Sequence, residues 1–436
     1  MAEEPDLPVK SMRLQNLRGF EDTGVLNFSG INFIFGKNSS GKTTLLRAPL
    51  LLKQLAGERS LVSGVPFSGP YVDFGSYPEA VYNSERSRDI ILSFEMNVEE
   101  SLSRMPRAIT RQVSFGPTTT IEIKLHWNAK SGQAQFNSIK MYNGESDELL
   151  FQFRRLGPES IRMESPLLGF HRTVSDASEL NLTTIRSLPL EIGPDPGSEA
   201  RLIELFTFAL TLSLNDSTRR IQHIGPLRDM PERAYRLDQL STSGGSTEHL
   251  VGMLVSHPDV VSRVSRALRR LNIARQIDVV SPAPGYAGVV LSSPDSPRRD
   301  NLADVGFGAS QVLPIIVRLA LARQRSMLLI EQPELHLHPE VQADLVDVMI
   351  DLARQRKCSL LVESHSENML LRIRRKIASR QLSPSDVKIF VTDSGKVREA
   401  PIDEKGRIEM SAFPLGFFEE EWFEAMGIIE GGARSV

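Results

Sequence analysis

Short apolar runs near the start of the chain are separated by Gly, Asp and Asn, a spacing that is typical of strands. They cover residues 12–20, 25–28 and 31–35. The third run leads directly into a polar, glycine-containing stretch at 36–43, and an apolar stretch with helical character follows at 44–55. The pattern therefore predicts a strand, a tight loop and a helix in immediate succession.

Segments further along the chain predict a sheet and two more helices. The strand-like segments lie at 90–98, 118–127, 138–142 and 148–154, and the turn residues between them indicate an antiparallel sheet. Residues 158–197 are rich in Pro, Ser and Gly, and we expect an irregular insertion there. An apolar helix is predicted at 199–214 and a helix with one apolar face at 260–271. Two strands joined by a turn at 282–285 are predicted within 276–291.

Two later strands are predicted to be buried on both faces. Residues 326–330 and 357–363 contain continuous apolar runs, as the strands of parallel sheets do. The fold class that follows is α/β, with a mixed or parallel sheet flanked by helices, an antiparallel β lobe and a β-rich insertion. The predicted division is an N-terminal core part at 1–87, the insertion at 88–200, a C-terminal core part at 201–400 and a C-terminal docking segment at 401–436.

Composition narrows the class of protein. The chain has 436 residues, enough for two or three lobes, and its 51 basic and 54 acidic side chains leave a net charge of −3. This balance gives no global basic field, so contacts with nucleic acid would need local patches. Cys358 is the only cysteine, which excludes a disulfide within one chain and fits a reducing cytoplasm. No apolar run approaches the ~20 residues of a membrane span, and the acidic start of the chain is unlike a secretion signal. We therefore expect a cytoplasmic protein without membrane contact.

The stretch at 36–43 has the spacing of a phosphate-binding P-loop in its strand-to-helix context. Its glycines let backbone N–H groups point at phosphate oxygens, and the following helix aims its positive end at the same place. Lys42 is expected to reach the outer phosphates, and the Thr43 hydroxyl suits a hard cation such as Mg²⁺. We therefore predict ATP and Mg²⁺ as cofactors. The predicted nucleotide-binding residues here are Gly36, Asn38, Ser39, Gly41, Lys42, Thr43 and Thr44.

Two candidate catalytic residues follow the buried strands. Glu331 comes directly after the run at 326–330, and a carboxylate at the C-terminal edge of a parallel strand can orient Mg²⁺ and its water shell. Thr43 and Glu331 are therefore the predicted metal residues. His365 comes just after the strand at 357–363, and we favour a γ-phosphate sensor there over a purely structural histidine.

The segment at 306–311 combines glycines with a hydroxyl before an apolar helix. Such a helix start is a second anion site, although a plain glycine loop with a serine cap fits the segment equally well. One subunit holds one triphosphate, so a second phosphate-seeking loop needs the nucleotide of a partner subunit. The helix is expected to begin at about Leu313, with Pro314 tolerated within its first turn.

These elements, in this order, resemble the ATP-binding-cassette-type ATPases of the RecF, SMC and overcoming-lysogenisation-defect group. The closest resemblance is to the defence-associated, SMC-like subset of AAA-type chains that end in a short uncharacterised domain. The matching segments are 16–20, 36–43, 72–76, 224–228, 306–311, 331–339, 363–367 and 414–418. The resemblance implies an ATPase head that forms a head-to-head homodimer, or a higher homo-oligomer, around sandwiched ATP.

The resemblance also implies roles for individual residues. Ser310, with Gly308 and Gln311 in the same signature, would contact the γ-phosphate that the other subunit's Lys42 holds. The remaining implied roles are a D-loop at Leu337 and His338, a switch histidine at His365 and a position beside the nucleotide for Arg18. His336 and His338, with Glu334 nearby, could also hold a metal, but a subunit-contact loop suits their position better.

One departure from the family pattern concerns the catalytic base. Gln332 stands where cassette ATPases generally place the glutamate that polarises the attacking water, and an amide cannot accept that proton. We therefore predict slow hydrolysis by Glu331, Gln332 and His365. Glu334 acting through a water molecule and an engineered ATP-trapping glutamine are the alternatives that the sequence leaves open.

The end of the chain carries no predicted nuclease. Related long chains end in a nuclease domain of the topoisomerase-primase type, but Asp393, Asp403 and Glu404 lack its acidic pattern. The tail at 417–423 mixes aromatic and acidic residues, so it is either a docking segment for a partner or a segment packed on the head.

The predicted function is that of a cytoplasmic ATPase acting as an ATP-dependent dimeric switch. The resemblance implies an antiphage or genome-defence role, in which the ATPase controls a separately encoded effector such as a nuclease or a toxin. The alternative is a RecF- or SMC-like ATPase that binds double-stranded DNA in repair or recombination. Arginine-rich helices at 263–270 and 372–380 motivate this alternative.

Overall fold

The computed structural model describes residues 6–57, 64–98, 116–157, 160–167, 169–174, 211–226, 230–238, 247–409 and 412–413. The helices are α1 (Lys42–Gly57), α2 (Tyr77–Ala80), α6 (Thr247–Ser256), α7 (Pro258–Arg270), α8 (Phe307–Leu321), α9 (Pro339–Arg356) and α10 (Glu367–Ala378). The predicted insertion beyond residue 174, most of the predicted helix at 199–214 and the tail at 417–423 lie outside the described residues.

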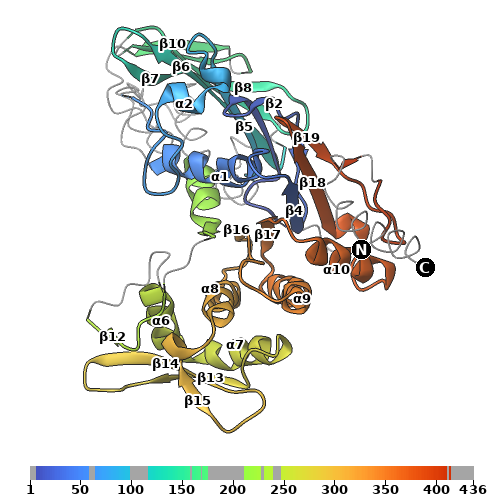
Figure 1. The fold of residues 1–436 in the computed structure, drawn as a ribbon. Coiled ribbons are helices and arrows are strands. Elements are labelled where there is room, and N and C mark those ends of the chain that lie inside the picture. Colours follow the sequence, from blue (N-terminus) through green and yellow to red (C-terminus); the bar gives the residue numbers. More distant parts are fainter. Residues whose placement is uncertain are drawn as a thin grey trace, which may run out of the picture.

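A long antiparallel sheet forms the upper lobe in Figure 1. Its strands are β1 (Ser11–Leu17), β2 (Phe20–Asp22), β3 (Leu26–Asn27), β5 (Ile90–Asn97), β6 (Thr118–Asn128), β7 (Gln133–Asn143), β8 (Leu149–Arg155), β9 (Ile161–Ser165) and β10 (Phe170–Val174). The order is β10-β9-β8-β7-β6-β5-β1-β2, and β3 pairs with β1. Alternate residues of β5 are buried, as expected for a strand with one covered face. The predicted antiparallel sheet is thereby confirmed, and β5 joins it to the N-terminal strands.

The second sheet has six strands and lies at the centre of the molecule. Its strands are β4 (Ile31–Gly36), β11 (Ile221–Ile224), β16 (Met327–Glu331), β17 (Ser359–Glu363), β18 (Val387–Asp393) and β19 (Lys396–Glu399). The order is β11-β16-β17-β4-β18-β19, and only β19 runs antiparallel to its neighbour. The predicted α/β fold with a mixed sheet is therefore confirmed.

Side chains on the two faces of this sheet enter different cores. Ile34 of β4 packs in the core that contains α1 and the antiparallel sheet, whereas Phe33 and Phe35 pack in the core that contains α8, α9 and α10. Burial on both faces explains the continuous apolar runs of the parallel strands. The P-loop helix α1 and the helix α8 consequently cover opposite faces.

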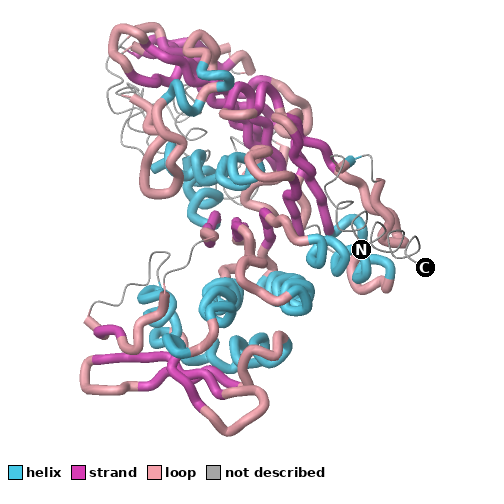
Figure 2. Tube along the Cα trace, viewed as in Figure 1, coloured by secondary structure: helices cyan, strands magenta, loops and turns pink. Residues whose placement is uncertain are grey.

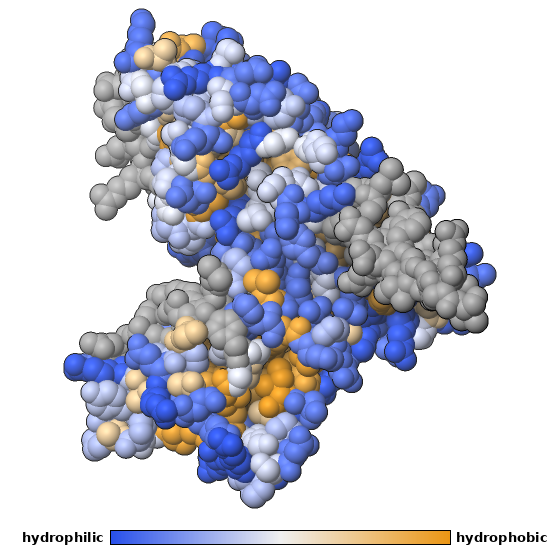
Figure 3. All heavy atoms as spheres, in the orientation of Figure 1, coloured by the Kyte–Doolittle hydropathy of each residue, from blue (hydrophilic) through white to orange (hydrophobic). Residues whose placement is uncertain are grey.

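Helices gather below the central sheet in Figure 2, together with a third, small sheet. This small sheet contains β12 (Tyr235–Arg236), β13 (Gln276–Val280), β14 (Tyr286–Ser292) and β15 (Arg299–Asn301). The predicted turn at 282–285 joins β13 to β14. Val260, Val264 and Leu268 of α7 are buried, which confirms the predicted apolar face. The largest apolar surface areas visible in Figure 3 lie on this lower lobe.

Helix α8 begins earlier than predicted. It starts at Phe307, not at about Leu313, so Pro314 lies in the helix interior and not in its first turn. Pro314 has no backbone N–H, so it cannot donate the helical hydrogen bond to the Ser310 carbonyl. Burial of Val312, Leu313 and their neighbours outweighs that lost bond and the weak helix propensity of the preceding glycines. Among the described helices, none is long and apolar enough to cross a membrane.

Candidate nucleotide-binding site

The P-loop joins β4 to α1 at the C-terminal edge of the central sheet. Gly41 has a φ of 101°, and a Cβ there would lie 2.4 Å from the Phe20 ring. A Cβ on Gly36 would lie 2.2 Å from the Thr392 hydroxyl oxygen at the end of β18. Both glycines are therefore needed for the close approach of neighbouring elements, which hold the loop in shape. The Ser40 and Thr392 hydroxyls, 2.6 Å apart, add a direct hydrogen bond.

The Lys42 side chain folds back over this loop. Its ammonium donates a hydrogen bond of 2.8 Å to the backbone carbonyl of Lys37, and the residue is only 4% exposed. Burial lowers the pKa of Lys42, while the charges of Glu363 and Glu334 act to raise it. The ammonium therefore lies within the loop and close to two carboxylates.

The Thr43 hydroxyl donates to Glu363, not to Glu331. The distance from Thr43 Oγ1 to Glu363 Oε1 is 2.9 Å. Glu363 ends β17 and is 2% exposed, and its other oxygen, Oε2, is buried without a hydrogen-bond partner among the described residues. Burial raises the pKa of Glu363 to about 7, and the adjacent charge of Glu331 acts in the same direction. The Thr43 hydrogen bond and the charges of Lys42 and Arg47 act against this shift.

Glu331 is the neighbour of Glu363 across the parallel strands β16 and β17. It is also 2% exposed, but both of its carboxylate oxygens accept hydrogen bonds. Arg47 of α1 donates to both oxygens, at 2.6 and 2.8 Å, and His223 Nε2 lies 2.6 Å from Oε1. Burial alone would raise the pKa of Glu331, but the hydrogen bonds from His223 and Arg47 leave the pKa below its ordinary value.

His365 and Glu334 are linked at the same edge. The His365 backbone amide donates to Glu334 Oε1 at 2.7 Å, so this carboxylate anchors the turn after β17. Burial and the charge of Lys42 lower the pKa of His365 to about 4, so its imidazole is neutral at pH 7. The backbone N–H of Gln332 donates to the backbone carbonyl of Glu363 at 2.9 Å, which places Gln332 beside these groups.

The signature and the D-loop segment pack against each other on the other side of the sheet. A Cβ on Gly308 would lie 3.3 Å from Leu337 Cδ2, and His338 immediately precedes α9. Ser310 and Gln311 are buried in the first turns of α8, at 6% and 1% exposure. The structure thus brings the predicted signature and D-loop together within one chain.

Arg18 lies over an aromatic ring within the same chain. Its guanidinium carbon is 5.3 Å from the centre of the Phe74 ring. This contact joins two of the segments that carried the family resemblance, 16–20 and 72–76. A position beside the nucleotide remains a prediction for Arg18.

Five residues at this edge were missed by sequence reasoning: Phe20, Arg47, His223, Glu363 and Thr392. Glu363 had a detectable signal, because it is a carboxylate at the end of a buried strand, as Glu331 is. Arg47 also had one, since it is a basic residue in an otherwise apolar part of the predicted helix. The other three depend on contacts between elements that are far apart in the sequence.

The residues present fit a Mg²⁺-nucleotide complex. Mg²⁺ in nucleotide sites is usually bound by one or two protein oxygens together with phosphates and waters. Thr43 supplies a hydroxyl oxygen and Glu363 a buried carboxylate oxygen with unused hydrogen-bonding capacity. In the described part of the chain, no three His, Cys, Asp or Glu side chains converge as a metal site of their own. The donor set therefore suits a metal that arrives with phosphate oxygens.

A strand, a glycine loop and a helix N-terminus on a parallel sheet, with carboxylates at the adjoining strand ends, define a P-loop architecture of the nucleotide-binding type. Comparison with known families agrees with this class. Residues 292–370 match the family described as AAA ATPase domain, and residues 11–157 match the one described as AAA domain. The two matched segments include the P-loop, Glu331 and Glu363, so the predicted likeness to ATPases is confirmed.

Solved structures with a related fold include heads of SMC proteins. The SMC head bound to the C-winged helix domain of ScpA has 12% identity and a TM-score of 0.48, covering 90% of this chain and 98% of that chain. The SMC head with an extended coiled coil bound to the C-terminal domain of ScpA, from Pyrococcus furiosus, has 10% identity and a TM-score of 0.45, covering 97% and 98%. The SMC head domain from Thermotoga maritima has 10% identity and a TM-score of 0.41, covering 91% and 99%. No curated protein matches the chain.

Proposed function

We propose that the protein binds ATP with Mg²⁺ at the P-loop, hydrolyses it slowly and acts as an ATP-dependent dimeric switch. The observation that carries the proposal is the P-loop at the sheet edge, where Lys42 folds back over the loop and Thr43 bonds to the buried carboxylate of Glu363. Helix α1 directs its N-terminus at the same point, which favours phosphate binding.

Each residue at this edge of the sheet would have a separate role in binding or hydrolysing ATP. Lys42 exchanges its bond to the Lys37 carbonyl for phosphate oxygens, because a charged acceptor is stronger than a neutral one. Bound Mg²⁺ would supply charge neutralisation for the phosphates. His365 is neutral at pH 7, so it can donate one hydrogen bond to a phosphate without adding charge. Gln332 can hold a water molecule in place but cannot accept its proton, which keeps hydrolysis slow.

The dimer and its effector complete the proposal. In the cassette arrangement, Gly308, Ser310 and Gln311 of one subunit would meet the nucleotide held by Lys42 of the other. The packing of Gly308 against Leu337 supports a common contact surface. We propose that a separately encoded effector reads the dimer state, in an antiphage or genome-defence system in the cytoplasm.

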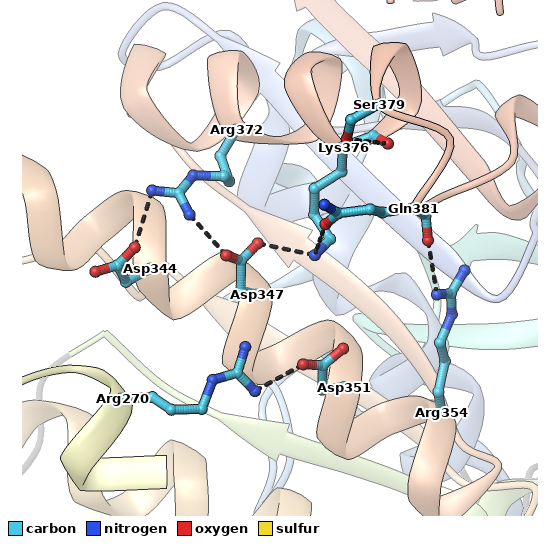
Figure 4. A network of polar contacts seen from close by, with 9 residues as sticks. All are labelled: Arg270, Asp344, Asp347, Asp351, Arg354, Arg372, Lys376, Ser379 and Gln381. Atoms are coloured by element: carbon cyan, nitrogen blue, oxygen red, sulfur yellow. Dashed lines mark hydrogen bonds and ion pairs between the residues drawn. The ribbon is translucent and has the colours of Figure 1, made fainter.

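DNA binding has less support than the switch. Two arginines of the helices that motivated it, Arg270 and Arg372, form ion pairs within the chain, as Figure 4 shows. Arg372 bonds to Asp344 and Asp347, at 2.8 and 2.6 Å, and Arg270 bonds to Asp351 at 2.6 Å. These carboxylates offset the cations that a phosphate backbone would need.

The test measures ATP binding and mass separately. Lys42→Ala should lower ATP affinity at least about 100-fold in calorimetry, because it removes the cation that faces the outer phosphates. Ser310→Arg should leave binding by the monomer intact and abolish the ATP-dependent increase in mass in light scattering. Retained ATP affinity in Lys42→Ala contradicts the P-loop role, and an unchanged mass increase in Ser310→Arg contradicts the contact between subunits.

A further inference from the structure

Two carboxylates, Glu331 and Glu363, stand side by side at the C-terminal edge of β16 and β17. They share the same residue type, the same strand position and the same 2% exposure. Their surroundings differ completely, and this difference indicates which of them faces a metal.

Glu331 has little capacity left for a metal or its waters, because both of its oxygens are already hydrogen-bonded. Arg47 occupies both oxygens, and His223 occupies Oε1 a second time. A bidentate guanidinium bond is among the strongest that a carboxylate forms in a protein. To reach a metal, Glu331 would have to break it and leave Arg47 without this partner. The arrangement ties α1 to β11 across the end of β16 and thereby positions the P-loop helix.

Glu363 has the opposite environment. Its single hydrogen bond is to the Thr43 hydroxyl, and its Oε2 is buried without a partner among the described residues. A buried polar atom without a hydrogen bond is costly unless another ligand uses it. The Thr43 hydroxyl can continue to donate its hydrogen bond to Glu363 Oε1 while its oxygen lone pairs face a cation. The free oxygen of Glu363 can then accept a hydrogen bond from a water on that cation.

We propose that Glu363, and not Glu331, is the carboxylate that orients Mg²⁺ and its water shell at Thr43, while Glu331 is a positioning residue held by Arg47 and His223. The inference rests on the proposed nucleotide function and reassigns the metal role that the sequence pattern gave to Glu331. It also places the acid on the strand that leads to His365, two residues away, so the metal and the proposed phosphate sensor share one support.

The test compares two isosteric variants, Glu363→Gln and Glu331→Gln, in the full chain. ATP affinity is measured by calorimetry with Mg²⁺ and with EDTA, and the ratio of the two dissociation constants gives the Mg²⁺ enhancement. Glu363→Gln should lose about 10- to 100-fold of this enhancement, as expected for a change beside a metal ligand, and keep its affinity in EDTA. Glu331→Gln should keep the enhancement and lower the melting temperature.

The opposite pattern, with the enhancement lost in Glu331→Gln and kept in Glu363→Gln, overturns the inference. An unaltered enhancement in Glu363→Gln also overturns it, while ATP binding by the wild-type protein would still support the nucleotide site. If the wild-type protein binds ATP neither with Mg²⁺ nor with EDTA, the proposed function fails and this inference fails with it. Should Glu363→Gln not fold, Glu363→Asp is measured in the same way, because it keeps the charge but withdraws the carboxylate from Thr43.

Discussion

Replacing Arg47 by methionine tests whether Glu331 is held in place by the ion pair. Arg47 contributes two of the three close polar contacts of Glu331, a residue that is 2% exposed. Breaking a buried ion pair by removing one partner costs about 3–5 kcal/mol, because a charge stays buried without compensation. The Arg47 side chain is 29% exposed and the contact with His223 remains, so the lower end applies. We expect a loss of about 3 kcal/mol in unfolding free energy.

The assay is urea or thermal unfolding of the full chain. In a large domain 1 kcal/mol corresponds to roughly 2 °C, so Arg47→Met should melt about 6 °C lower than wild type. The double variant Arg47→Met/Glu331→Leu is the matched control. It removes both charges together, and paired replacement of a buried ion pair by apolar residues is often neutral. Its stability should therefore recover most of the loss.

The pH dependence of this difference gives a further check. The pKa of Glu331 is below its ordinary value of 4.5, so its contribution to stability is present above pH 4.5 and is lost as the pH falls further. The gap between wild type and Arg47→Met should accordingly narrow below pH 4.5. A loss under about 0.5 kcal/mol in Arg47→Met, or a double variant as unstable as the single one, would refute the structural role of the pair.

Two further predictions concern the loop and the single cysteine. Gly41→Ala should abolish ATP binding, because Gly41 has a φ of 101° and a Cβ there would lie 2.4 Å from the Phe20 ring. The control variant Gly19→Ala should bind ATP as the wild type does, because no atom lies within 4 Å of its Cβ. Equal ATP affinities of the two variants in calorimetry would contradict the steric argument. Cys358 should resist alkylation at pH 8 in the native protein and react after unfolding, since burial raises the pKa of its thiol to about 12; rapid labelling of the folded chain, followed by mass spectrometry, would contradict the assignment.

Local patterns in the sequence were sufficient for the strands and the loop of the site. The run at 31–35 became β4, and the glycine-containing stretch after it became the P-loop, because these features depend on neighbouring residues. The strand at 326–330 also appeared where the apolar run predicts it, as β16. The predicted start of α8 was wrong, since Pro314 was assigned to the first helical turn, whereas it lies in the interior of a helix that is stabilised by burial.

The identity of the acid beside Thr43 could not be predicted in the same way. Both Glu331 and Glu363 end buried strands, so their local patterns are alike. What separates them is which side chains reach each carboxylate from α1 and β11, and those contacts span 284 and 108 residues of sequence. The register of β16 against β17, which sets the two acids side by side, is likewise a tertiary property.

The pair of acids also connects the proposed slow ATP hydrolysis to the proposed dimeric switch. Two adjacent buried carboxylates repel each other unless cations balance them; Arg47 forms an ion pair with Glu331, whereas Glu363 feels the charges of Lys42 and Arg47 without such a pair, and its pKa stays raised. A Mg²⁺-nucleotide complex would balance Glu363, so nucleotide binding stabilises the very edge that also carries His365. A ligand at 100 times its dissociation constant adds about 2.7 kcal/mol to the state that binds it. In the proposed switch, Gln332 in place of a general base would let that stabilised state outlive a fast hydrolytic cycle, so that an effector could read it.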